Sequence, residues 1–155
     1  MVMKRISIAV CLFVAACGGE EDGGPDGEQE PVAWQDMSFE QREEYMTDVV
    51  LPEVRETFVA FDAKFETMGC ATCHGDGATD GTYTMPSPQI AVLPGTEEAF
   101  LEYAKDPEHA RWSDFMFQKV VPQMADLLQV ERYDPTTHTG TFSCHNCHTL
   151  DGVEE

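Results

Sequence analysis

The chain has 155 residues, and 29 acidic side chains outnumber 9 basic ones to give a net charge of −20. A chain this acidic is repelled by phosphates, which excludes nucleic acid as its partner. Its length suits a single folded domain.

The first 16 residues have the pattern of an export signal. Lys4 and Arg5 precede a short apolar run at residues 6–16, which is too short to span a bilayer comfortably. The run leads into Val-Ala-Ala-Cys at residues 14–17, which resembles the lipobox of bacterial lipoproteins. We expect residues 1–16, including Cys11, to be removed and Cys17 to be lipidated. The alternative is an ordinary signal peptide with a coincidental cysteine.

Residues 18–31 read GGEEDGGPDGEQEP, with no apolar side chain to form a core. We therefore expect a disordered acidic tether at residues 17–31 and a folded domain at residues 32–155. Loss of Lys4 and Arg5 leaves 7 basic and 29 acidic residues, so the mature charge is 7 minus 29, or −22. This charge favours basic partners, or it only keeps the protein soluble.

A first long helix is predicted from Ser38, because Gln41 three residues later completes a capping box. Pro52 falls inside the helical pattern and should kink the helix or divide it in two. One apolar face follows at helical spacing: Met46, Val50, Val54 and Phe58.

Residues 70–74 read Cys-Ala-Thr-Cys-His. In one turn of helix, positions i, i+3 and i+4 share a face, so both sulfurs and the imidazole can meet one flat ligand. This spacing is typical of c-type haem. We expect Cys70 and Cys73 to form thioethers with the haem vinyl groups and His74 to bind the iron.

Between this motif and the next long helix, we expect loops and one short helix. Residues 75–81 are rich in turn formers, and residues 85–94 are punctuated by proline. Thr96 is a predicted N-cap for a helix to residue 106, with Phe100, Leu101 and Ala104 as its packing face. Strand patterns are weak throughout the chain.

A second long helix is predicted from Asp106, with Pro107 at its first position. Pro122 again falls inside the pattern. The apolar face comprises Met116, Val120, Met124 and Leu128.

A second motif, Cys-His-Asn-Cys-His, occupies residues 144–148. Cys144, Cys147 and His148 are expected to hold a second haem, while His145 points away from them. Two alternatives use the cysteines alone. The two pairs could form one four-cysteine zinc site, or they could form disulfides or a redox pair.

The two halves are related by a constant offset, since 116 minus 46 and 122 minus 52 are both 70. We therefore predict a mostly α fold: a small helical dihaem domain with long loops and two pseudo-repeated units of helix, loop and CxxCH motif. The equivalence selects Met46 and Met116 as sixth ligands of the two irons. Four other residues compete for this role: Met85, Met124, His109 and His138.

A methionine on a helix that precedes its own CxxCH motif resembles the repeating unit of the multihaem cytochrome subunit of photosynthetic reaction centres. The resemblance covers residues 46–74 and 116–148, with two units in place of four and longer intervals. It implies a helical, pseudo-symmetric haem pair with histidine and methionine ligands. It does not imply photosynthesis.

These features predict an exported, membrane-anchored dihaem c-type cytochrome that transfers electrons between redox partner proteins and catalyses no bond chemistry. Gly18 in place of aspartate favours the outer membrane over the inner one, with display at the cell surface also open. One alternative is a peroxidase-like haem enzyme with an open axial position served by His138 or His109. Another is a zinc-binding or disulfide-stapled interaction module.

Overall fold

The computed structural model describes residues 32–152, which belong to one compact unit spanning residues 31–155. These residues are mostly helical with long loops, as predicted. The expected signal at residues 1–16, Cys17 and the tether at residues 17–31 lie outside the described residues.

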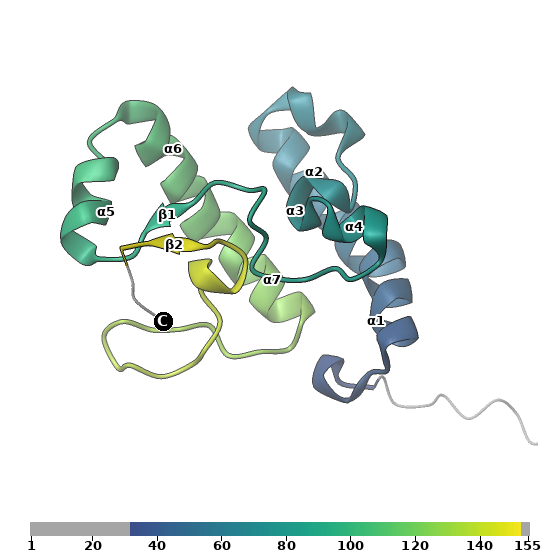
Figure 1. Cartoon of the computed structure of the whole chain (residues 1–155). Coiled ribbons are helices and arrows are strands. Elements are labelled where there is room, and N and C mark those ends of the chain that lie inside the picture. The colour runs from purple at the N-terminus through teal and green to yellow at the C-terminus, as the bar shows by residue number, and fades with distance from the viewer. Residues whose placement is uncertain (1–31, 153–155) are drawn as a thin grey trace, which may run out of the picture. The chain divides into compact units, whose positions relative to one another are not determined.

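A continuous helix follows Ser38 and ends at Phe61 (Figure 1). It consists of α1 (Phe39–Tyr45), a π-helical stretch (Met46–Val50) and α2 (Leu51–Phe61). The predicted capping box is confirmed. The Gln41 amide donates to Ser38 Oγ at 3.3 Å, and the Ser38 amide donates to Gln41 Oε1 at 2.8 Å.

The second long helix has the same order of α-helical and π-helical stretches. It consists of α6 (Pro107–Phe115), a π-helical stretch (Met116–Val120) and α7 (Val121–Leu127). Asp106 is its N-cap, as predicted, because its carboxylate accepts the amides of Glu108 at 2.9 Å and His109 at 3.1 Å.

Each π-helical stretch ends two residues before a proline. The Leu51 amide donates to the carbonyl of Met46, and the Val121 amide donates to that of Met116, in both cases five residues back. A proline ring collides with the carbonyl four residues before it in a regular α-helix. The wider π turn accommodates that ring, so Pro52 and Pro122 sit in continuous helices rather than dividing them.

The remaining elements are short (Figure 1). Strands β1 (Leu93–Pro94) and β2 (Leu150–Asp151) pair in parallel, with Leu93 opposite Leu150. None of the helices described between residues 32 and 152 has the length and apolar content to cross a membrane. The short helices are α3 (Ala71–His74), α4 (Gly77–Asp80), α5 (Glu97–Tyr103) and the 3₁₀ turns Trp34–Asp36, Ala63–Thr67 and Cys144–Asn146.

The two long helices meet where α2 contacts the π-helical stretch Met116–Val120. Aromatic rings fill this contact. The Phe58 ring lies 5.1 Å from the Phe115 ring and perpendicular to it, and Phe61 stacks on Phe115 at 3.9 Å. The first cluster of buried side chains is formed by Val50, Val54, Phe58, Met68 and Phe115, and the second by Ala125, Leu128 and Phe142.

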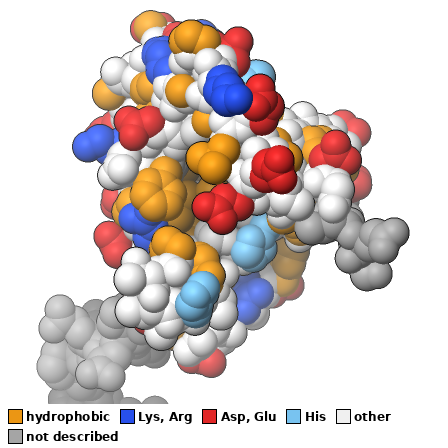
Figure 2. Space-filling view, turned by 90° about the vertical axis from the view of Figure 1, so that its left-hand side faces the viewer, with side chains coloured by type: hydrophobic (Ala, Val, Ile, Leu, Met, Phe, Trp, Pro, Cys, Tyr) orange, Lys and Arg blue, Asp and Glu red, His pale blue; other side chains and the backbone are white. Residues whose placement is uncertain are grey.

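The prediction for α5 is wrong in one respect. Leu101, expected on the packing face, has 62% of its surface exposed. Helix α5 is short and contacts β1, which leaves this side of the helix in solvent. Figure 2 shows apolar side chains at one face of the molecule with acidic side chains beside them.

Candidate functional site

The two CxxCH motifs share one pair of main-chain hydrogen bonds, although the first is α-helical and the second begins as a 3₁₀ turn. In the first, the His74 amide donates to the carbonyl of Cys70 at 2.9 Å, and the Cys73 amide donates to the same oxygen at 3.2 Å. In the second, the His148 and Cys147 amides donate to the carbonyl of Cys144 at 2.9 and 3.2 Å. Each motif is therefore a single helical turn, which places two sulfurs and one imidazole on a common face.

Both motif histidines make the same kind of hydrogen bond. His74 Nδ1 lies 3.1 Å from the carbonyl oxygen of Tyr83, and His148 Nδ1 lies 2.7 Å from that of Ala91. A carbonyl only accepts, so Nδ1 carries the proton in both rings. In the neutral ring, Nε2 then keeps its lone pair, which is the arrangement that a metal-binding histidine needs.

The environment of His74 favours the neutral ring. Burial lowers the pKa of this imidazole, and the hydrogen bond to Tyr83 opposes the shift as the smaller effect. The Tyr83 ring also meets the imidazole edge-on, with centroids 5.5 Å apart. His74 is thus both oriented and available as a ligand at neutral pH.

The second cysteine of each motif lies deeper than the first. Burial raises the pKa of Cys73 to about 11, with Cys70 as a lesser cause. Burial also raises the pKa of Cys147 to about 11, and the next cause is the charge of Cys73 from the other motif. Cys147 and Cys73 therefore lie near enough for their charges to interact. Cys73 packs against the first buried cluster and Cys147 against the second.

The four-cysteine zinc site considered from the sequence is not formed. Between residues 32 and 152, no three His, Cys, Asp or Glu side chains converge on a point where a metal ion could bind. Cys70, Cys73, Cys144 and Cys147 are all free thiols. The donors instead fit a c-type haem, which brings its own four nitrogen ligands and needs two thiols and one imidazole at each motif.

An apolar pocket adjoins the second motif. It is small, with a volume of about 40 Å³, and its lining includes Phe142 and Met124 of α7, so it offers an apolar surface beside Cys144 and Cys147. The pocket is lined by Val120, Val121, Met124, Phe142, Ser143, Cys144, Cys147 and His148.

The two predicted methionine ligands occupy the same position in the two long helices. Met46 and Met116 each begin a π-helical stretch and each is partly buried. Met46 contacts both buried clusters, whereas Met116 contacts the first. Of the competing methionines, Met124 lines the pocket at the second motif, and Met85 lies half-buried in the loop after the first.

The competing histidines make contacts of their own, with His109 partly buried and His138 exposed. His109 stacks on Tyr103 at 3.8 Å, and its Nδ1 donates to the Tyr103 carbonyl. His138 shares a hydrogen bond of 2.9 Å with the Tyr133 hydroxyl. His145 is exposed, as predicted, and bonds to Ser143.

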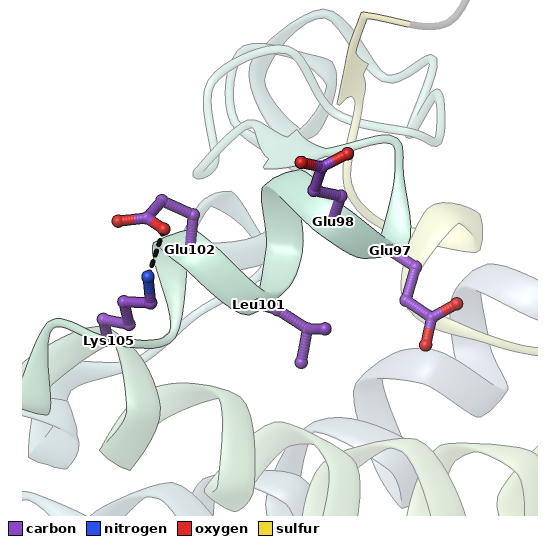
Figure 3. Close-up of a pocket in the computed structure, with 5 residues that line it drawn as sticks. All are labelled: Glu97, Glu98, Leu101, Glu102 and Lys105. Carbon is purple, nitrogen blue, oxygen red and sulfur yellow. Dashed lines mark hydrogen bonds and ion pairs between the residues drawn. The ribbon is translucent and has the colours of Figure 1, made fainter.

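A shallow hollow also runs along α5, away from both motifs in sequence (Figure 3). Its side chains are exposed, and Lys105 pairs with Glu102. The lining combines one leucine with charged residues and offers no convergent donor set: Glu97, Glu98, Leu101, Glu102 and Lys105.

Sequence reasoning missed the two acceptors of the histidine hydrogen bonds. Tyr83 and Ala91 act through main-chain carbonyls, which every residue carries, so no side-chain pattern could reveal them. A positive φ of 48° at Tyr83 is the local feature that turns its backbone, and tyrosine gives no sequence signal for it.

No known protein family, curated protein or solved structure matches this chain.

Proposed function

We propose that the protein is a dihaem c-type cytochrome that transfers electrons between protein partners. The observation that carries the proposal is the shared arrangement of the two motifs. In both, an Nδ1–H donates to a main-chain carbonyl and leaves Nε2 free beside two partly buried thiols.

Cys70 and Cys73 would hold one haem through thioethers, with His74 as the axial ligand. Cys144, Cys147 and His148 would hold the other in the same way. When bound, haem supplies an iron that alternates between two oxidation states. The chain would fix the imidazole orientation through Tyr83 and Ala91 and partly bury the thiols.

Met46 and Met116 are the proposed sixth ligands. The pseudo-repeat supports this choice, because the π-helical stretches start at residues 46 and 116 and the prolines follow at 52 and 122, all with an offset of 70. Bulges of this kind often occur at functional sites. Two filled axial positions suit electron transfer rather than chemistry on a substrate.

The proposal includes export and anchoring. Residues 1–16 would direct the chain across the inner membrane. A lipid on Cys17 would then anchor the tether at residues 17–31 to the periplasmic side of a membrane, and the outer membrane is the preferred one. Labelling with a tagged fatty acid should attach lipid to the native chain and none to Cys17→Ser. Absence of label on the native chain would contradict the lipid anchor.

Mass spectrometry tests the cofactor directly. The full chain, produced in a host with a haem-attachment system, should carry the added mass of two haems. The paired variants Cys70→Ala/Cys73→Ala and Cys144→Ala/Cys147→Ala should each carry one. A colourless native protein without added mass would refute the proposal.

A further inference from the structure

One non-helical segment contacts both CxxCH motifs. This bridging segment, residues 83–95, supplies the Tyr83 carbonyl to His74 and, eight residues later, the Ala91 carbonyl to His148. The two histidines are 74 positions apart in sequence, yet their acceptors lie on one short stretch of backbone. The orientation of each ring therefore depends on where this stretch is held.

Main-chain hydrogen bonds fix the bridging segment to the second motif. The Ser87 amide donates to the carbonyl of Cys147 at 3.1 Å, within the motif itself. The amides of Leu93 and Gly95 donate to Thr149 at 3.0 Å and to Asp151 at 2.8 Å. The segment thus runs parallel to residues 147–151 on both sides of Ala91.

A side chain fixes the same segment to the first motif. Gln89 Nε2 donates to Asp76 at 3.1 Å, two residues after His74. Gln89 also lies directly over Gly75, where an added Cβ would come within 2.8 Å of the Gln89 Cβ. Ser87, which is fully buried, donates its hydroxyl to Gln89 Oε1 at 3.2 Å and so joins the two attachments.

We infer that Gln89 and Ser87 are positioning residues that jointly fix the orientation of the histidines in both motifs. Gln89 touches the first motif through Gly75 and Asp76, but its attachment to Ser87 carries its position to Cys147 and Ala91. A change at Gln89 therefore reaches His148, across the boundary between the two units. The consequence for haem rests on the proposed function, whereas the coupling between the motifs is a property of the chain alone.

Amide hydrogen exchange on the full chain tests the coupling, comparing the native protein with Gln89→Ala. Losing the side-chain amide of Gln89 removes its hydrogen bonds to Asp76 and Ser87. Exchange of the main-chain amides in residues 87–95 and 147–151 should then become about fivefold faster or more. Gln35→Ala is the matched control, because that side chain is exposed and only its main-chain carbonyl is used, by Arg42. Unchanged exchange in residues 147–151 of Gln89→Ala would overturn the inference.

Exchanging the acidic and amide side chains between Gln89 and Asp76 separates a specific positioning role from a general loss of stability. Gln89→Glu places a carboxylate against Asp76 and should speed exchange at both motifs, whereas Gln89→Glu with Asp76→Asn restores a donor and an acceptor and should return it to the native rate. Failure of this rescue would contradict the assigned contact.

A redox titration of the same variants supplies the haem readout. Both midpoint potentials should move in Gln89→Ala and stay at their native values in Gln35→Ala. A shift in only one potential would overturn the inference, whereas a protein without haem would refute the proposed function and leave the exchange result standing.

Discussion

At the scale of residues, the two CxxCH motifs repeat the same features. In each motif, one helical turn joins the first cysteine to the histidine, the second cysteine is the more deeply buried one, and the histidine donates a hydrogen bond to a main-chain carbonyl. A proton fixed on Nδ1 increases the availability of Nε2 and sets the plane of the ring. These details are what the proposed haem ligands require, and they come from backbone atoms that no motif describes.

The proposed axial ligands Met46 and Met116 can be tested by substitution with leucine, which conserves volume. Met46→Leu and Met116→Leu should each abolish the absorption band of one sulfur–iron bond and lower one midpoint potential, because thioether ligation raises the potential. Optical spectra of the oxidised protein measure the band.

Met124→Leu is the control for this pair, because Met124 lines the pocket at the second motif without occupying the repeated position. Loss of a band in Met124→Leu, with the band intact in Met116→Leu, would transfer the ligand role to Met124.

Gly75→Ala should destabilise the protein by about 2 kcal/mol, since φ at this position is +56° and the new Cβ would press on Gln89. Gly81→Ala is a reference for an ordinary left-handed glycine, because Gly81 has φ of +77° and ψ of 10° and nothing within 4 Å of the added atom. It should cost about 1 kcal/mol. Denaturant unfolding measures both, and a loss in Gly75→Ala no larger than that in Gly81→Ala would contradict the prediction.

At the scale of elements, each long helix combines a capped start, a π-helical stretch and a proline. Restoring an amide at the proline should let the helix return to α geometry and turn the methionine relative to the residues that follow. Pro52→Ala is therefore expected to alter one sulfur–iron band and Pro122→Ala the other. Spectra unchanged in both variants would mean that the π-helical stretches do not depend on the prolines.

The cap of the second helix should respond to pH. Hydrogen bonds from the His109 and Glu108 amides lower the pKa of Asp106 below its usual 3.8. The charged cap therefore stabilises the helix above that pH, and the stabilisation is lost as pH falls through the lowered pKa. Asp106→Ala should reduce the melting temperature at pH 7, whereas Asp106→Asn keeps the cap and removes this part of the pH dependence. Thermal unfolding between pH 2 and 7 distinguishes them.

The helices were predictable because their signals are local. Ser38 with Gln41 and Asp106 with Pro107 specify both starts, and the apolar spacing around Val54 specifies the buried face of the first helix. On the second helix, Leu128 of the predicted face is buried, but Phe115 and Ala125, which are also buried, were not predicted. The π-helical stretches were not predicted, because they depend on how each proline ring is accommodated. The face of α5 was mispredicted at Leu101, where burial depends on which elements are near.

At the scale of the whole molecule, the two long helices meet through the aromatic contact of Phe58 and Phe115. The two CxxCH motifs are linked by the bridging segment and by the interaction of Cys73 with Cys147. The sequence predicted two related units but could not predict these contacts, because they join residues far apart in the chain. Their effect is to bring the two proposed haem sites close together, as electron transfer between them requires.

Charge acts at the same scale and leads to a kinetic prediction. With −20 on the full chain by the count of its ionisable residues, the protein should attract cationic reaction partners and repel anionic ones. Reduction of the oxidised protein by a cationic metal complex should therefore slow as salt rises, since charges are screened over about 10 Å at 0.1 M ionic strength. Reduction by an anionic complex of similar driving force should accelerate under the same change. Stopped-flow traces at increasing sodium chloride measure both slopes, and slopes of the same sign would show that the sites exchange electrons through a face that this charge does not control.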